Sequence, residues 1–176
     1  IGLLLRDSTL NVRALEVEDN SLIAASSLGD FYQLFVDGEA IGKVNYNEIE
    51  GSNMDSIGNN NFRAIASINK PKSNALHHNV GVTIGSPAKL YKDGVLVYQE
   101  NHEKAFYDAL DFWNDQEGIA IGDPTDDCMS IIITRDGGNT WNKLSCDVLP
   151  KAKEGEAAFA ASDTNIAIVG DKTWVA

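Results

Sequence analysis

Four charged residues occupy equivalent places in a pattern that recurs along the chain. Arg13, Arg63 and Asp108 each precede an alanine and an aliphatic residue, and a looser alignment places Glu156 in the same position. Each would stand at the start of an innermost strand, so a repeated fold would gather the four at one mouth of a central channel. There they would bind an anionic ligand, or pair with one another as a salt-bridge network between neighbouring repeats. Both interpretations stay open, and these residues form the candidate ligand-binding site.

A sialidase-like glycoside hydrolase would need more than these residues. Such a site gathers arginines for the substrate carboxylate, a tyrosine nucleophile and acidic partners. The chain has only the arginines Arg6, Arg13, Arg63 and Arg135, and Arg135 falls in a turn. The sequence contains no Gly-x-Ser-x-Gly motif and no Gly-x-Gly-x-x-Gly motif. Their absence disfavours a serine hydrolase and a dinucleotide-dependent oxidoreductase, so we predict no catalytic residues.

Neither the acidic residues nor the histidines show a metal-binding spacing. Asp123, Asp126 and Asp127 cluster in one loop, and oxygen-rich loops hold calcium. Their spacing matches no known calcium loop, so we interpret them as a solvated acidic surface. The chain's three histidines have no cysteine partners at the spacing of a zinc site. We predict neither a metal nor a cofactor.

The two cysteines, Cys128 and Cys146, flank a predicted β-hairpin. If Arg135 and Thr140 face each other across its turn, Cys128 faces Asp147, one position from Cys146. A small change of register or a bulge would bring the two sulfurs together. The alternatives are a disulfide, which fits a periplasmic or secreted protein, and two half-buried free thiols.

The composition excludes several partners. The 176-residue chain has a formal net charge of −12, whereas contacts with nucleic-acid phosphates or anionic lipids need a basic surface. No apolar run approaches the roughly 20 residues of a membrane span. Hydrophobic residues make up 43% of the chain, enough for a packed core. A protein or a glycan is the remaining kind of ligand.

An internal repeat organises these residues. The positions of Arg13, Arg63 and Asp108 each open a short strand, and a second strand rich in small residues follows. A third strand then runs into a turn, and a fourth strand leaves it. The three turns carry the same dipeptide, at Asp37-Gly38, Asp93-Gly94 and Asp136-Gly137.

Four short antiparallel strands per unit of 40 to 50 residues are typical of β-propeller blades. We therefore predict an all-β chain that forms one partial propeller domain over residues 1–176. The approximate blades cover residues 10–50, 60–101, 105–146 and, incomplete, 156–176. The polar segments 45–61 and 69–79 are predicted to be loops.

The third turn matches a complete motif. Residues Thr134–Trp141 fit the pattern Ser/Thr-x-Asp-x-Gly-x-Thr-Trp, which is the Asp-box or bacterial neuraminidase repeat. The aspartate can accept backbone N–H groups, the glycine can take a positive φ, and the tryptophan can cover the hairpin. The motif shapes a turn and carries no chemistry of its own. Its structural residues are Thr134, Asp136, Gly138, Thr140 and Trp141. The two earlier Asp-Gly turns look like decayed copies.

The chain resembles Asp-box propellers most specifically from about residue 106 onward. The runs Gly118–Trp141 and Gly155–Ser162 are similar to bacterial single-domain propellers labelled putative oxidoreductase or glycosyl hydrolase. They also resemble the photosystem II assembly and stability factor and the sortilin-like and sialidase propellers. Those proteins are rings of six to eight blades, whereas about three and a half are expected here, so the resemblance implies a fragment.

Three functions follow as hypotheses. The first is a non-catalytic binding or assembly scaffold of the Asp-box type, outside the cytoplasm. The second is a carbohydrate-active propeller, either a hydrolase or a lectin-like glycan binder. The third is a structural half of a larger propeller. Open blades expose apolar faces and strand edges, so we also expect self-association or a partner chain that completes the ring.

Overall fold

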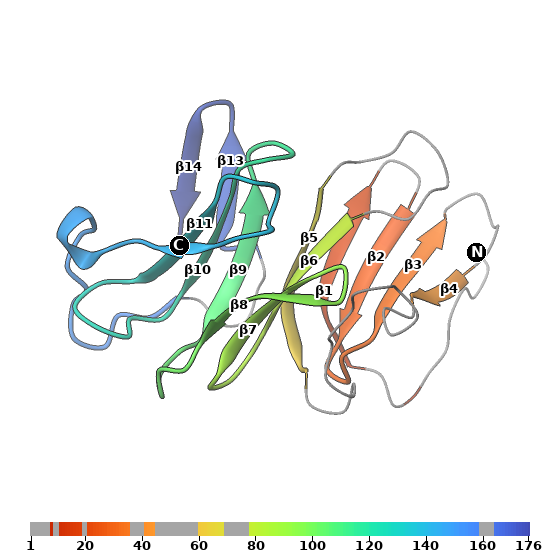
Figure 1. The fold of residues 1–176 in the computed structure, drawn as a ribbon, viewed down its shortest axis with the longest axis horizontal. Coiled ribbons are helices and arrows are strands. Elements are labelled where there is room, and N and C mark those ends of the chain that lie inside the picture. Colours follow the sequence, from red (N-terminus) through yellow and green to blue (C-terminus); the bar gives the residue numbers. More distant parts are fainter. Residues whose placement is uncertain are drawn as a thin grey trace.

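The computed structural model describes residues 8, 11–18, 21–35, 41–44, 60–68, 78–158 and 164–176 of the chain. This part is built of β-strands, with one short 3-10 turn, η3 (Cys146–Val148), so the predicted all-β class is confirmed (Figure 1). Three four-stranded antiparallel sheets and a two-stranded hairpin follow one another along the chain. None of the described helical segments is long and apolar enough to cross a membrane.

The strand order in every sheet is the order of the chain. The first sheet contains β1 (Val12–Glu18), β2 (Ser21–Ser26), β3 (Phe31–Phe35) and β4 (Ile41–Val44). The second contains β5 (Phe62–Ile68), β6 (His78–Thr83), β7 (Ala88–Lys92) and β8 (Val95–Glu100). The third contains β9 (Tyr107–Phe112), β10 (Gly118–Gly122), β11 (Ser130–Thr134) and β12 (Asn142–Lys143). The hairpin is β13 (Ile166–Val169) with β14 (Lys172–Val175).

The sheets stack face to face, and the core lies between them. Phe31 of the first sheet meets Phe62 of the second edge-on, with ring centroids 4.5 Å apart. Trp141, directly before β12, makes a similar edge-on pair with Phe112 of β9, and both join the cluster between the second and third sheets. Strand β5 is buried along its whole length because it is covered on both faces. The first strands of the sheets, β1, β5 and β9, lie side by side, with β5 in contact with both others (Figure 1).

Glycines on the second strands leave room for aromatic rings. A Cβ on Gly81 of β6 would stand 2.8 Å from Phe31 Cζ of the first sheet. A Cβ on Gly118 of β10 would stand 2.8 Å from the ring of Phe112, its paired residue on the neighbouring strand β9. Such separations are below van der Waals contact, so a larger residue at either position would displace the ring beside it.

Two of the three predicted Asp-Gly turns join strands of the described chain. Asp93-Gly94 connects β7 to β8, and Asp136-Gly137 lies between β11 and β12. The third, Asp37-Gly38, lies outside the described residues, as does most of the predicted loops 45–61 and 69–79. No closed ring of sheets forms in the described chain, so the interpretation of each sheet as a propeller blade stays a prediction.

Candidate functional site

The three aligned residues Arg13, Arg63 and Asp108 share one structural position. Each of β1, β5 and β9 carries a β-bulge near its start, where the pairing with the second strand skips one residue. The skipped residues are Arg13, Arg63 and Asp108. A bulge redirects a side chain away from the regular alternation of a strand, and bulges concentrate beside functional sites. The sequence repeat thus corresponds to a repeated backbone feature.

The backbone fixes all three bulges in the same way. The carbonyl two residues before each bulged residue accepts an N–H from the residue that follows the second strand, at 2.9 Å in every sheet. These pairs are Asn11 with Ser27, Asn61 with Ile84, and Phe106 with Asp123. In the third sheet Gly122 is required beside this contact, because a Cβ there would lie 2.0 Å from the Phe106 oxygen.

Arg63 and Asp108 form a buried pair without direct hydrogen bonds. Arg63 Nε lies 3.9 Å from Asp108 Oδ1, and the two side chains are 6% and 0% exposed. Arg63 Nε and Nη2 and both Asp108 carboxylate oxygens are buried and have no hydrogen-bond partner. A buried polar group left unsatisfied costs about 1–3 kcal/mol, more if it is charged. Four such atoms lie together here, whereas most buried polar atoms in folded proteins are hydrogen-bonded.

The surroundings of Asp108 disfavour its ionised form. Burial raises the pKa of Asp108, the Asp123 carboxylate raises it further, and Arg63 opposes both, which leaves the pKa at about 6 against an ordinary 3.8. The carboxyl therefore titrates just below neutral pH. It can donate a hydrogen bond when protonated and accept two when ionised.

The other two predicted site residues lie further out. Arg13 occupies the equivalent bulge but is exposed. Glu156 belongs to no described strand, and its exposed carboxylate accepts the N–H of Lys153 at 2.7 Å. It lines a groove of about 460 Å³ together with Asp123. Arg63 and Asp108 do not line this groove, but Asp123, which does, acts electrostatically on Asp108.

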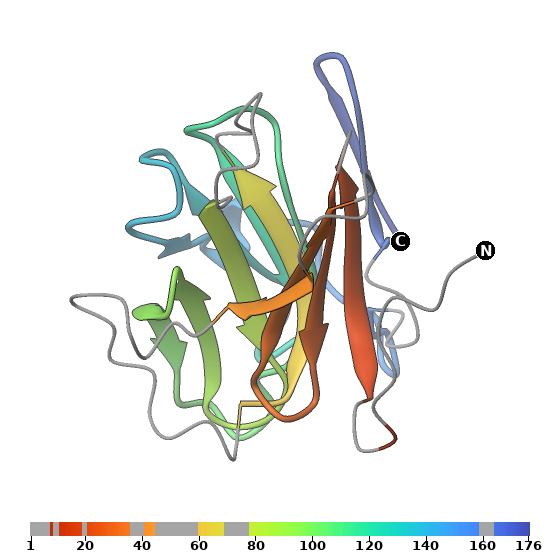
Figure 2. The ribbon, with the colours of Figure 1, turned by 90° about the vertical axis from the view of Figure 1, so that its right-hand side faces the viewer.

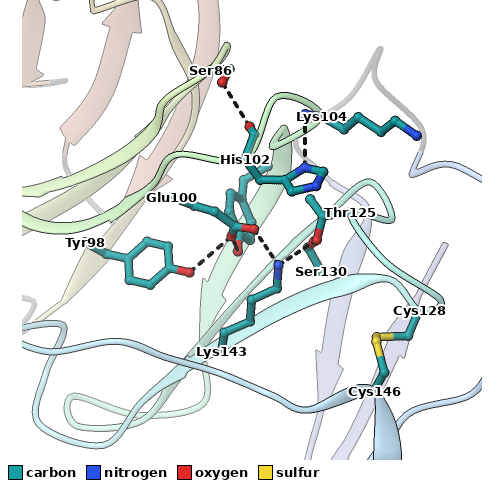
Figure 3. Close-up of polar contacts among 11 residues, drawn as sticks. Ser86, Tyr98, Glu100, His102, Lys104, Thr125, Cys128, Ser130, Lys143 and Cys146 are labelled. Atoms are coloured by element: carbon teal, nitrogen blue, oxygen red, sulfur yellow. Dashed lines mark hydrogen bonds and ion pairs between the residues drawn. A yellow bond between two sulfur atoms is a disulfide. The ribbon is translucent and has the colours of Figure 1, made fainter.

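A second polar cluster connects the second and third sheets and was not predicted (Figure 3). Glu100 Oε2 accepts the Tyr107 hydroxyl at 2.6 Å and the Tyr98 hydroxyl at 3.1 Å, while Lys143 Nζ contacts Glu100 Oε1. Lys143 also donates to Thr125 Oγ1 at 2.7 Å. No sequence motif predicts this cluster, because its members come from four separate segments of the chain.

The charges of this cluster are mutually satisfied. Burial alone would raise the pKa of Glu100, but hydrogen bonds from Lys143, Tyr107 and Tyr98 outweigh it and hold the pKa below its ordinary value. Burial, followed by the bond to Glu100, raises the pKa of Tyr107 well above its ordinary value. The buried Tyr107 hydroxyl therefore stays protonated and donates to Glu100.

The cysteines are joined. Cys128 and Cys146 form a disulfide whose Cα atoms are 5.4 Å apart. Ile133 pairs with Asn142 in the expected hairpin register. Beyond β12, however, the chain turns through η3, so Cys128 pairs with Lys151 and not with Asp147. The disulfide borders a second groove, of about 620 Å³, which Thr125 and Lys143 also line.

Hydrogen bonds to the Asp136 side chain hold the turn Thr134–Trp141 together. The carboxylate accepts the Thr140 N–H at 2.9 Å and hydroxyls from Thr134 and Thr140 at 2.9 and 2.7 Å. Gly138 has φ +81° and donates its N–H to Thr134 Oγ1. The buried Trp141 donates from Nε1 to the Gly138 carbonyl at 3.1 Å. The aspartate of the earlier turn, Asp93, does not bond within its own turn in this way. Its carboxylate accepts the Asn79 N–H of β6.

Removal of the Asp136 carboxylate should loosen this turn. We expect Asp136→Ala to lower the free energy of unfolding by about 1–3 kcal/mol, since three hydrogen bonds to a partly exposed charged group are lost. Urea titration followed by tryptophan fluorescence measures the change. Asp126→Ala, on an exposed loop position, is the matched control. Equal stabilities for the two variants would show that the turn does not depend on Asp136.

Arg135 does not join the other arginines. It lies in the Thr134–Trp141 turn and pairs with Glu117, while Arg63 pairs with Asp108. Arg6 lies outside the described residues. Among the described residues, no three acidic, histidine or cysteine side chains come together as a metal site.

No model of a protein family matches the chain, and no curated protein matches it. The crystal structure of the computationally designed Ika4 protein is 14% identical over 99% of both chains, with a TM-score of 0.47. That of the designed Ika8 protein is 14% identical, with a TM-score of 0.42; the match covers 72% of this chain and 34% of Ika8. The chain thus spans about a third of the Ika8 protein.

Proposed function

We propose that the chain is a non-catalytic binding scaffold of the Asp-box propeller type, and that its ligand site is the bulge cluster. We define this cluster as Arg63 and Asp108, with Asp123 and Glu156 along the adjoining groove. The observation that carries the proposal is the pair of buried side chains, Arg63 and Asp108, whose polar atoms lack hydrogen bonds. A ligand that supplies those bonds would recover the free energy that burial costs.

The chemistry of the bulge cluster favours a neutral ligand rich in hydroxyl groups. Arg63 offers the two donors Nε and Nη2 on one edge, and Asp108 offers two acceptors. An anion would meet Arg63 but would be repelled by Asp108, Asp123 and Glu156, and the chain as a whole carries a formal charge of −12. Adjacent hydroxyls of a glycan can accept from the guanidinium and donate to the carboxylate together. We therefore propose a neutral glycan, and not the anionic ligand that was one of the two interpretations of the sequence.

Two features support a binding role over a catalytic one. The buried Tyr107 has a raised pKa, and the charge of its partner Glu100 is neutralised by Lys143. A retaining glycosidase needs two carboxyl groups free to act as nucleophile and acid on opposite sides of one bond. Within the bulge cluster, the Asp123 carboxylate already accepts the Ala158 N–H at 2.9 Å, and the Glu156 carboxylate accepts the Lys153 N–H.

The disulfide supports a location outside the cytoplasm, since such bonds persist in oxidising compartments. The stacked four-stranded sheets support the interpretation of each sheet as a propeller blade. In that arrangement the first strands β1, β5 and β9 would face the channel, and the three bulges would surround one of its mouths. A binding scaffold with its ligand at the channel mouth accounts for these features together.

Ligand-observed saturation-transfer NMR with a panel of neutral monosaccharides tests this function. We expect at least one of galactose, mannose and N-acetylglucosamine to receive saturation from the wild-type protein, and Arg63→Lys to reduce the signal at least tenfold. Lysine keeps the charge but loses the two-donor edge of arginine.

Arg135→Lys is the matched control, because Arg135 sits in an exposed turn and should leave the signal unchanged. N-acetylneuraminic acid serves as the anionic comparison and should bind more weakly than the neutral sugars. The proposal fails if no neutral sugar receives saturation, or if Arg63→Lys and Arg135→Lys behave alike.

A further inference from the structure

The groove lined by Asp123 and Glu156 is built from four connecting segments. They are the turn from β6 to β7, the link from β8 to β9, the residues that follow β10, and the chain before β13. Figure 2 shows the link from β8 to β9 at the same end of the sheets as the starts of β1 and β5. Loops that a rigid scaffold brings together at one end are a common place for binding sites.

Hydrogen bonds between these segments give the groove a defined shape. The Ser86 hydroxyl donates to the His102 carbonyl at 2.9 Å (Figure 3). The Asp123 N–H donates to the Phe106 carbonyl at 2.9 Å, and Asp123 Oδ1 accepts the Ala158 N–H at 2.9 Å. The walls are therefore in place before a ligand arrives, as they are in most small-molecule sites.

Phe106 is the aromatic residue that lines this groove. It is partly exposed, and it belongs to none of the four apolar clusters of the described chain. An aromatic ring outside the core can pack against the apolar CH face of a sugar ring. Phe106 precedes the bulged Asp108 by two residues, so the groove borders the bulge that carries the buried pair.

The charged residues of the groove favour a neutral ligand that donates hydrogen bonds. The carboxylates of Glu103, Asp123 and Glu156 outnumber the single ammonium group, that of Lys104, so an anionic sugar would be repelled. Asp123 and Glu156 each use one carboxylate oxygen on a backbone N–H. The second oxygen of each can accept a hydroxyl group.

We propose that this groove binds a second sugar unit, so that the ligand is a neutral oligosaccharide and not a single sugar. The inference rests on the proposed function, since the first unit is the sugar bound by Arg63 and Asp108. The second unit packs one face on Phe106 and donates hydroxyls to Asp123 and Glu156. The groove volume of about 460 Å³ lies within the roughly 300–1,000 Å³ of small-molecule sites. Because the linked units bind together, a disaccharide binds more tightly than its monosaccharide.

Isothermal titration calorimetry of the full chain tests the proposal. The probes are galactose, mannose and N-acetylglucosamine, each compared with its homodisaccharide: galactobiose, mannobiose and N,N′-diacetylchitobiose. For at least one pair we expect the disaccharide to have a Kd at least tenfold lower. Phe106→Ala should abolish this difference and leave the Kd of the monosaccharide unchanged, whereas Phe106→Trp should retain the difference.

Trp174→Ala, at an exposed aromatic residue of β14, is the matched control and should bind both sugars as the wild type does. Thermal melting checks the fold of each variant. Phe106→Trp separates a loss of the aromatic surface from a loss of structure, because it keeps an aromatic ring at the same position.

The other outcomes distinguish this proposal from the proposed function. If no sugar of either length binds, both fail. If a monosaccharide binds and its disaccharide binds no more tightly, the second unit is absent from the groove while the proposed function stands. A tenfold difference that survives Phe106→Ala would also overturn the proposal, because the second unit would then lie elsewhere. Disaccharide binding that Phe106→Ala removes and Arg63→Lys leaves unchanged would support the groove and contradict the buried pair as the site of the first unit.

Discussion

Replacing Asp108 with asparagine should remove a large pH-dependent destabilisation. The folded pKa of Asp108 is about 6 against an ordinary 3.8, so the folded state binds the proton more tightly than the unfolded state. Stability from this group is greatest at low pH and is lost as the pH rises from about 4 through 6. Between pH 4 and pH 7.5 the loss is about 2–3 kcal/mol. Asparagine does not titrate, so the free energy of unfolding of Asp108→Asn lacks this pH-dependent contribution.

The measurement is the free energy of unfolding of both proteins in urea, at several pH values between 4 and 7.5. The stability of Asp108→Asn relative to wild type should rise by about 2–3 kcal/mol across this range. Other carboxyl groups cancel in the difference. Asp126→Asn, at an exposed loop position, is the matched control. A flat difference for Asp108→Asn would mean that Asp108 titrates normally.

Removal of the disulfide should lower the free energy of unfolding by an amount similar to the pH-dependent effect of Asp108. Cys128 and Cys146 are 18 residues apart, and opening a loop of that length lowers the free energy of unfolding by about 3 kcal/mol in the chain-entropy description. We expect Cys128→Ala combined with Cys146→Ala to show this loss. The loss should also reach the segment after η3, which returns beside Cys128 at Lys151.

Urea titration with and without reductant measures the effect. Wild type should lose stability when reduced and approach the double variant, whereas the double variant should be insensitive to reductant. Hydrogen exchange should show the greatest loss of protection in the Ala152 N–H, which donates to the Asp127 carbonyl at 2.6 Å. If reductant leaves wild type unchanged, the disulfide does not contribute to stability.

The local features of the fold were predictable because they depend on neighbouring residues. The Asp-Gly dipeptide at position 93 predicts the turn between β7 and β8, and Asp93 takes the positive φ that such a turn requires. The turn at Asp136 and the spacing of its threonines predict the β11–β12 register. Repetition of these signals predicts an all-β chain of four-stranded units, although sequence spacing cannot specify how many units close a ring.

The candidate site was predictable only in part. The repeat aligns Arg13, Arg63 and Asp108, but no local signal shows that Arg63 and Asp108 alone are buried together. Their burial depends on how neighbouring sheets pack. The contact of Glu100 with Lys143 joins residues 43 positions apart, and its strength comes from shared burial between two sheets. The pairing of Cys128 with Lys151 depends on η3, which the hairpin register does not reveal.

The most direct test is the pKa of the Asp108 carboxyl, read from carbon-13 NMR of aspartate-labelled protein across pH 3 to 8 and assigned with Asp108→Asn. If the bulge cluster is a binding site with unsatisfied polar atoms, the pKa will be about 6 in the free protein. A pKa at or below the ordinary 3.8 would mean that Arg63 and Asp108 form a closed, hydrogen-bonded ion pair. That result would make the bulge cluster a structural contact and contradict the proposed binding function.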